Sequence, residues 1–167
     1  MKVKLFLLVA VMGLIGMGTA RADCTKNQIA FPTSGSALRV PSGTCIAPIS
    51  QAVCLRWDNN GNGRLDLFDT DESGQLIWCA HDIQNPSACA SGNSFCLQVN
   101  GNATIWTGST CGTGTMVWQS GTVNKNIKGE VIKIVDGPDC GEMVAIVNMV
   151  DTVFPANVWF SNNCDTK

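Results

Sequence analysis

Side chains that could hold a hydroxyl-rich ligand gather around one predicted hairpin, within residues 95–106. Gln98, Asn100 and Asn102 carry amides, which both donate and accept hydrogen bonds and can therefore match hydroxyl groups. Trp106 follows at the same two-residue spacing and could supply an aromatic wall. The simpler interpretation is that the asparagines form the turn and that Gln98 is a solvent-facing strand residue. Both interpretations stay open at this point.

The dipeptide Asn100-Gly101 indicates where this hairpin turns, because both residues tolerate a positive φ. A two-residue turn would mix apolar and polar side chains on one face, whereas a three-residue turn over 100–102 separates them. We therefore expect the three-residue turn. It pairs Val99 with Ala103, Gln98 with Thr104 and Leu97 with Ile105.

Related hairpins are predicted twice more, at 54–68 and 131–147, and each of the three is followed by an apolar segment that ends in tryptophan. Trp78, Trp118 and Trp159 lie 40 and 41 residues apart. A steady period indicates repeated units, none of which can bury its apolar face alone. The predicted units span about 51–82, 93–122 and 130–163.

The first residues have the pattern of an export signal. Two lysines precede the apolar run 5–15, and small residues at 20 and 22 supply a cleavage pattern. We expect a signal peptide over 1–22, cleavage after Ala22 and a single mature domain over 23–167. The apolar run is short for a membrane span, so the mature protein is expected to be secreted and extracellular. A retained membrane anchor is the alternative.

The charge of the mature chain bears on its partners. Without the predicted signal peptide it carries 8 basic and 13 acidic side chains, a net charge of −5. A mildly acidic surface without a basic cluster argues against nucleic acid and anionic membranes as partners.

Cysteine usage predicts disulfide bonds rather than zinc. No CxxC pair exists, His81 is the single histidine, and an export signal places the chain in an oxidising compartment. Nine cysteines allow up to four bridges and leave one sulfur over, in a connectivity that the spacing does not decide. They are residues 24, 45, 54, 79, 89, 96, 111, 140 and 164.

The mature chain shows no convincing helix, and about twelve short apolar segments separated by turns indicate a sandwich, barrel or prism. Over about 28–163 the chain resembles the bulb-type (monocot mannose-binding) lectin domain. Residues 62–69 and 73–78 are similar to the repeat body of that family, and 34–43 to its opening segment. The resemblance implies an all-β fold, a disulfide-stabilised β-prism of three four-stranded antiparallel sheets with pseudo-threefold symmetry.

The resemblance also implies a carbohydrate site. The sugar motif of the family is Gln-x-Asp-x-Asn-x-Val-x-Tyr, and the second unit keeps its spacing with Asn for Asp, Thr for Val and Trp for Tyr. The chain contains no tyrosine. The site residues implied here are Gln98, Asn100, Asn102, Thr104 and Trp106.

In the other two units, the strand positions equivalent to Gln98 have fewer groups available to a ligand. In the first unit Arg56 lies opposite Asp66, where a cross-strand ion pair would be structural. In the third unit Lys133 lies opposite Ala145. We therefore expect the second unit to bind the ligand.

These observations predict a secreted, non-enzymatic, lectin-like protein that binds a neutral hexose of mannose-type glycans or glycoproteins and needs no cofactor. Because a single pocket of this kind is shallow, homo-oligomers or dense glycans would strengthen binding. The alternative is a lectin-fold protein that has lost sugar binding and acts as a secreted interaction or toxin-like module.

A calcium loop competes for residues 58–69, which fit the pattern D-x-[DN]-x-[DN]-G. An EF-hand needs helices on both sides, and the preceding segment is predicted as strand, so a hairpin loop is the favoured interpretation. The ligands would be Asp58, Asn60, Asn62, the Arg64 carbonyl and Asp69.

Two further motifs bear on modification and on catalysis. Asn102-Ala-Thr104 is an N-glycosylation sequon, and a glycan there would obstruct the predicted sugar site. For catalysis, His81 beside cysteine is the nearest approach to a nucleophile and base, and no further catalytic signature accompanies it.

The cysteine count makes a first prediction. Mass spectrometry of the secreted protein under non-reducing conditions should find at most one alkylatable thiol per chain. Five or more free thiols would mean that the compartment, and hence the export signal, had been misjudged.

Overall fold

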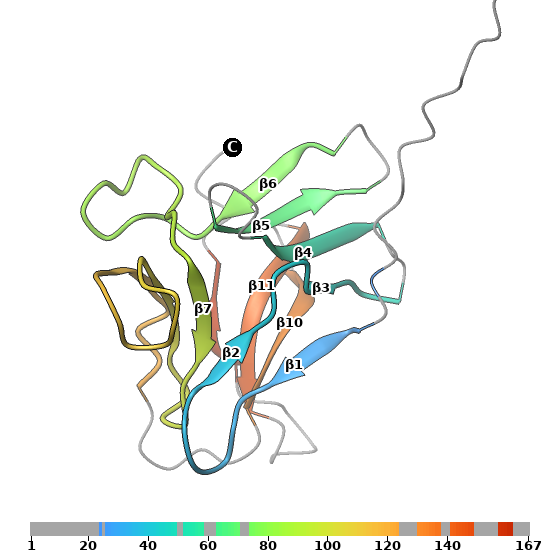
Figure 1. Ribbon diagram of the computed structural model, residues 1–167. Helices are drawn as coiled ribbons and strands as arrows, with labels where there is room; N and C mark the ends of the chain where they lie inside the picture. Colours follow the sequence, from blue (N-terminus) through green and yellow to red (C-terminus); the bar gives the residue numbers. More distant parts are fainter. Residues whose placement is uncertain are drawn as a thin grey trace, which may run out of the picture.

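The computed structural model describes residues 24, 26–49, 52–58, 63–70, 74–123, 130–137, 141–148 and 157–161 of the 167-residue chain. Twelve strands lie within these ranges (Figure 1). They are β1 (Gln28–Ala30), β2 (Leu38–Val40), β3 (Cys45–Ile46), β4 (Val53–Asp58), β5 (Arg64–Asp69), β6 (Leu76–Cys79), β7 (Ser94–Leu97), β8 (Ala103–Trp106), β9 (Met116–Gln119), β10 (Glu130–Gly137), β11 (Gly141–Asn148) and β12 (Asn157–Phe160).

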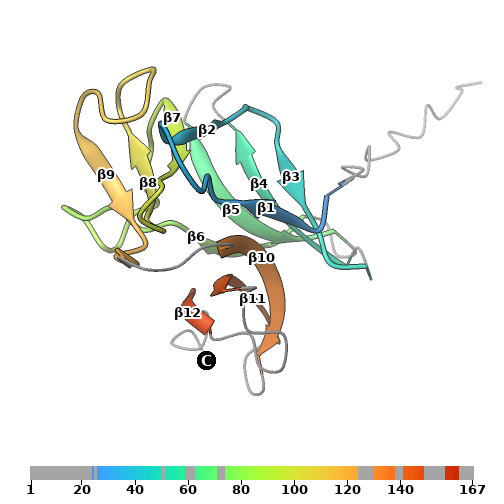
Figure 2. The ribbon, with the colours of Figure 1, turned by 90° about the horizontal axis from the view of Figure 1, so that it is seen from below.

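The strands form three four-stranded antiparallel sheets, which confirms the predicted all-β prism. Their strand orders are β3-β4-β5-β6, β2-β7-β8-β9 and β1-β10-β11-β12. Figure 2 shows the three hairpins, β4–β5, β7–β8 and β10–β11, placed around a common centre. Each sheet therefore consists of a hairpin, the strand that follows it, and one strand from elsewhere.

The extra strand of every sheet comes from the N-terminal segment. β1 pairs with β10, β2 with β7 and β3 with β4, so residues 28–46 pass along all three sheets in turn. These strands have only two or three residues each. Such short edge strands add few hydrogen bonds, but together they tie the three hairpins into one body.

One apolar core joins the inner faces of the three sheets. Trp57 and Phe95, from different sheets, have ring centroids 5.7 Å apart, and Trp78 meets Trp118 at 6.4 Å in an edge-to-face contact. Trp78 and Trp118 are 7% and 5% exposed, as the tryptophan period predicts. The side chain of Trp159 lies outside the described residues.

The predicted registers of the first and third hairpins are confirmed. Leu55 lies opposite Leu67 and Arg56 opposite Asp66 in the first, and Lys133 lies opposite Ala145 in the third. In both, alternating apolar residues face the core, and a slip of one residue would expose them all.

The predicted register of the second hairpin is wrong by two residues, because Leu97 pairs with Ala103 rather than with Ile105. The amide of Gly101 donates to the Gln98 carbonyl at 3.0 Å, and Gly101 has a φ of 82°. This is a three-residue loop closed by a left-handed glycine, so the turn occupies 99–101 and Val99 leaves the strand. A shift of two residues keeps every side chain on its face, so the core pattern survives the error.

Disulfides lie on the outer faces of two sheets. Cys79 is bonded to Cys89 and Cys96 to Cys111. The sulfur atoms of three further cysteines, Cys24, Cys45 and Cys54, converge, with Cys45 bonded to either neighbour. Because a sulfur forms one disulfide, this cluster holds one bridge and one further sulfur. Cys140 and Cys164 lie outside the described residues.

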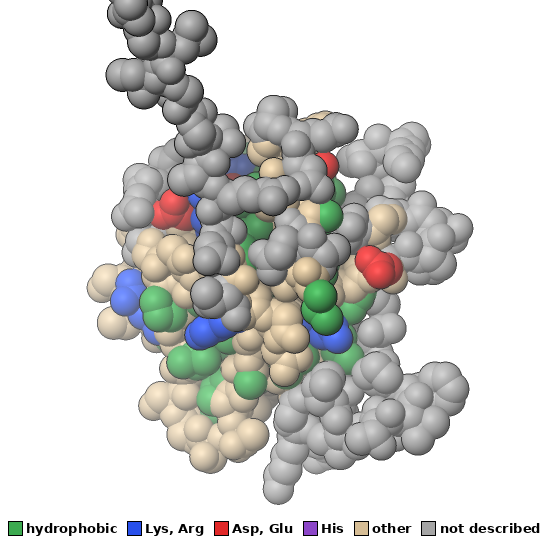
Figure 3. All heavy atoms as spheres, turned by 90° about the vertical axis from the view of Figure 1, so that its right-hand side faces the viewer, with side chains coloured by type: hydrophobic (Ala, Val, Ile, Leu, Met, Phe, Trp, Pro, Cys, Tyr) green, Lys and Arg blue, Asp and Glu red, His purple; other side chains and the backbone are tan. Residues whose placement is uncertain are grey.

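On the face shown in Figure 3, the described charged side chains are scattered among polar and apolar ones. Within the described ranges, no helix has the length and apolar character needed to cross a membrane. The predicted signal peptide, 1–22, lies outside them and stays a prediction.

The shared core generates a prediction about stability. Trp118→Ala should lower the free energy of unfolding by about 3–5 kcal/mol, because it removes a large buried ring and leaves a cavity. Denaturant titration would measure this, with Trp106→Ala as control. Trp106 is only half-buried, so its loss should cost clearly less, and equal costs would contradict the common core.

Glu130, at the start of β10, generates a second prediction. Its side chain is 1% exposed, it abuts Gly101, and among the described residues neither carboxylate oxygen has a hydrogen-bond partner. Burial raises the pKa of the Glu130 carboxyl above its ordinary value. The folded chain therefore holds this proton more tightly than the unfolded chain does, and the stability it contributes at low pH is lost as the pH rises above about 4.5.

Glu130→Gln should remove that loss. Compared with the parent, the variant should gain stability progressively as the pH rises from 4 to 7, because the amide has no charge to desolvate. Unfolding titrations across that range test this, and a stability difference that does not vary with pH would contradict it.

Candidate functional site

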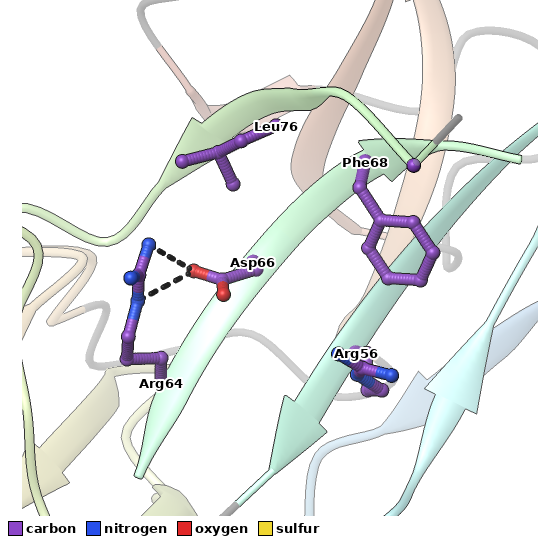
Figure 4. A pocket seen from close by; sticks show the side chains of 6 residues that line it. Arg56, Arg64, Asp66, Phe68 and Leu76 are labelled. Atoms are coloured by element: carbon purple, nitrogen blue, oxygen red, sulfur yellow. Dashed lines mark hydrogen bonds and ion pairs between the residues drawn. The ribbon is translucent and has the colours of Figure 1, made fainter. Parts of the chain in front are cut away.

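The outer face of the β3–β6 sheet holds a pocket of about 390 Å³ (Figure 4). Leu65 and Leu67 face the core, so the alternate residues of β5 face outward. Here the name first-unit pocket is used for the cavity lined by Arg56, Arg64, Asp66, Phe68, Gly74 and Leu76.

An ion pair between two residues of β5 forms one side of the pocket. Arg64 contacts Asp66 Oδ1 through both Nε and Nη2, each at 3.2 Å. Burial raises the pKa of the Asp66 carboxyl, while the guanidinium of Arg64 acts in the opposite direction. The second oxygen, Oδ2, accepts no hydrogen bond from any described residue and faces the pocket (Figure 4).

The predicted ion pair between Arg56 and Asp66 is wrong, although the two residues are opposite in register. Asp66 pairs with Arg64, and the Arg56 guanidinium lies over the ring of Phe68, with Cζ 5.0 Å from the ring centroid. A cation over an aromatic face is attracted by the ring quadrupole, which gives Arg56 a second favourable position. Among the described residues, no hydrogen bond or ion pair engages its guanidinium.

Residues at both ends of the pocket contact cysteine side chains. Phe68 packs against the cluster of Cys24, Cys45 and Cys54. At the other end, Arg64 Nη2 donates to the Sγ atom of Cys89 at 3.0 Å, and Cys89 is bonded to Cys79. The apolar wall and the ion pair are therefore each anchored to a cross-linked segment, which limits how far they can move.

The predicted site of the second unit is partly closed, because Asn102 and Thr104 are buried. Thr104 is fully buried on the outer face of β8, beside the Cys96–Cys111 disulfide. Its hydroxyl accepts a hydrogen bond from Trp106 Nε1 at 2.9 Å. The Thr104 hydroxyl thus orients the Trp106 indole, and the threonine side chain itself is not accessible to a ligand.

Asn102 also has structural partners. It is 4% exposed, its Nδ2 donates to Gln119 Oε1 at 3.2 Å, and its Oδ1 accepts from the Ser120 hydroxyl and the Gly121 amide at 3.0 Å each. A glycan on the sequon nitrogen would displace the bond to Gln119. Asn102 fastens the hairpin turn to the end of β9.

The remaining residues of the predicted second-unit site are accessible but do not converge. Asn100 is exposed and its Oδ1 accepts from the Asn102 amide at 3.1 Å, while Gln98 is half-buried beside the turn. Trp106 lies at the far end of β8, about 13 Å from Asn102 along the strand. Their role in binding stays a prediction.

The calcium loop is not assembled around one centre. Asp58 pairs with Arg64 at one end of the hairpin, and Asp69 pairs with Val53 at the other. Arg64 and Asp69 are five residue steps apart along an extended strand, about 17 Å, so a single ion cannot contact both ends. Asn60 and Asn62 lie outside the described residues.

A further pocket, of about 350 Å³, lies beside the third unit, where sequence reasoning expected little. It combines Lys133 and Asp136 of β10 with Gln28 of β1 and with Ile49, which is 94% exposed. Part of its apolar lining, Pro48 and Ile49, follows β3, a segment distant in sequence from β10. The pairing of β1 with β10 and the bridge between Lys26 and Ile46 bring these groups together.

Sequence reasoning placed Arg56 and Asp66 at the equivalent position of the first unit, as a structural ion pair, and missed that this face forms the pocket. The alternation of side chains along β5 was the usable signal. Residues 64, 66 and 68 must share one face of the sheet, because Leu65 and Leu67 occupy the other. The positions of Gly74 and Leu76 depend on the pairing of β6, which contains a register shift opposite 67–68.

Comparisons with known proteins give one structural likeness. No protein-family model matches the chain, and no curated protein matches its sequence. Among solved structures it is similar to the Japanese Marasmius oreades lectin, with a TM-score of 0.47 and 19% identity, over 78% of this chain and 92% of that one. A likeness of this degree assigns neither a ligand nor site residues.

Proposed function

We propose that the protein is a secreted, non-enzymatic carbohydrate-binding protein of the bulb-type lectin kind and that the first-unit pocket is its principal sugar site. The observation that carries the proposal is that, among the described residues, Asp66 Oδ2 has no hydrogen-bond donor and the Arg56 guanidinium has no hydrogen-bond acceptor, although both line one outward-facing pocket.

The chemistry of this pocket suits a sugar ring. Sugar hydroxyls both donate and accept, so one can donate to Asp66 Oδ2 while its neighbour accepts from Arg56. The ring edge of Phe68 and the side chain of Leu76, 46% exposed, offer apolar surface to the C–H groups of the ring. A volume near 390 Å³ lies in the range of small-ligand pockets.

The fold supports binding better than catalysis. His81 Nδ1 is hydrogen-bonded to the Pro86 carbonyl at 2.6 Å, and the nearby Cys79 and Cys89 are joined in a disulfide. In the described part of the chain, the sequence-predicted candidates for nucleophile and base are therefore otherwise engaged. A shallow pocket gives useful strength through dense glycans or association of several copies.

The second unit remains the rival location. Gln98, Asn100 and Trp106 stay accessible, whereas Asn102 and Thr104 would have to leave their protein partners to reach a ligand. Releasing buried polar groups without replacement costs about 1–3 kcal/mol each, which favours the first-unit pocket.

The test is titration calorimetry of the secreted protein against the glycans that a glycan array identifies, a mannose oligomer included. Asp66→Asn should weaken binding about tenfold or more, because a charge-assisted hydrogen bond contributes roughly 1.5–3 kcal/mol. Gln98→Ala, the matched control, should leave the affinity within about twofold, a difference of roughly 0.4 kcal/mol.

The opposite pattern, with binding lost in Gln98→Ala and kept in Asp66→Asn, would move the site to the second unit. Absence of binding to every glycan on the array would overturn carbohydrate binding and favour a protein-interaction module of the same fold.

A further inference from the structure

We propose that the first-unit pocket selects sugars that carry a carboxylate, with Arg56 as the group that recognises it. This deepens the proposed function and rests on it. The sequence alone predicted a neutral hexose and assigned Arg56 a structural ion pair, so the selectivity follows only from the side-chain arrangement.

Among the described residues that line the pocket, the basic side chains outnumber the acidic ones by one. Its lining contains two guanidinium groups and one carboxylate, and Asp66 is paired with Arg64. Asp58, on the same face of β4, accepts a hydrogen bond from Ser42 and does not line the pocket. Among these described residues, the charge of Arg56 is therefore the one without an ion-pair partner, in a chain whose net charge is −5 once the predicted signal peptide is removed.

The geometry prepares Arg56 for a planar anion. Its guanidinium lies 5.0 Å from the centroid of the Phe68 ring, and Phe68 is packed against the cysteine cluster. A guanidinium held over a ring keeps its N–H groups directed outward in its own plane. Two of them can donate in parallel to the oxygens of one carboxylate, which is the strongest arrangement for this pair.

Asp66 limits the ligand further. Its free Oδ2 accepts a hydrogen bond but repels a second anionic group, so a ligand with several adjacent charges is disfavoured. The matching ligand has one carboxylate for Arg56 and a neighbouring hydroxyl for Asp66. Uronic acids and sialic acids both have this chemistry, and the experiment distinguishes them.

The measurement is calorimetric titration of the full chain, produced in an exporting host, with three probes. They are methyl β-glucuronide, methyl β-glucoside and the methyl glycoside of N-acetylneuraminic acid. The first two differ only in the carboxylate, so the proposal expects the glucuronide to bind about tenfold tighter or more. If the sialoside alone shows the tighter binding, the carboxylate source is a sialic acid and the recognition by Arg56 stands.

Substitutions test whether Arg56 is the residue that causes the preference for the acidic probe. Arg56→Gln should reduce the preference for the acidic probe to within about twofold, and Arg56→Lys should retain part of it, because lysine keeps the charge but not the paired donors. The matched control is Arg39→Gln, which removes an exposed arginine of β2 whose Nη2 donates to the Asn93 carbonyl. It should leave the preference unchanged.

The outcomes separate the two proposals. Equal affinity for the glucoside and both acidic probes overturns the carboxylate selectivity and leaves sugar binding intact. Binding to none of the three probes, together with a blank glycan array, overturns the proposed function itself. An equal loss of preference in Arg39→Gln and Arg56→Gln would show non-specific attraction between charges and would also overturn the assignment to Arg56.

Discussion

The structure depends on one packing constraint, which is that three single-layer sheets must bury their inner faces against one another. No hairpin has a partner sheet of its own, so Trp57 of one sheet meets Phe95 of another at the centre of the prism, and Phe95 in turn contacts Trp118 of its own sheet. A ring contact of this kind adds about 0.5–1.5 kcal/mol to the burial of its apolar area. Loss of one sheet would expose the faces of the other two, so the three units are expected to fold together.

The same constraint leaves the outer faces without a second layer. On the described sheets, disulfides occupy that side, with Cys79–Cys89 beside β5 and β6 and Cys96–Cys111 beside β7 and β8. Where the covering loop reaches across, as over Thr104, the face is closed. Where it does not, as between the two sulfur-rich ends of the β3–β6 sheet, a pocket with polar and aromatic walls remains. The position of the candidate site is thus a consequence of where the cross-links lie.

Much of the fold could be predicted from the pattern of apolar residues. The alternation in β4, β5, β10 and β11 determined their register, because one-residue slips expose the core. The second hairpin was harder, since Val99 is apolar yet lies in the turn that Gly101 closes. The N-terminal strands were beyond prediction as sheet members, because two or three residues contain too little pattern to name a partner.

The candidate site was less predictable than the fold. By position, either Arg56 or Arg64 could pair with Asp66. The outcome depends on how far each side chain extends, which the strand register alone does not determine. The burial of Asn102 and Thr104 depends on β9 and on the loop held by Cys111, both distant from the motif in sequence. Residue types at the correct spacing therefore identified a plausible site, but contacts outside that spacing decide which face is open.

The central claim is that the open face of the β3–β6 sheet binds the ligand. The most direct measurement is amide chemical-shift mapping of isotope-labelled protein during titration with a glycan that binds. The account predicts that the largest shifts fall on Arg56, on residues 64–68 and on Leu76. Shifts confined to residues 98–106, or to Gln28 and Lys133, would contradict it.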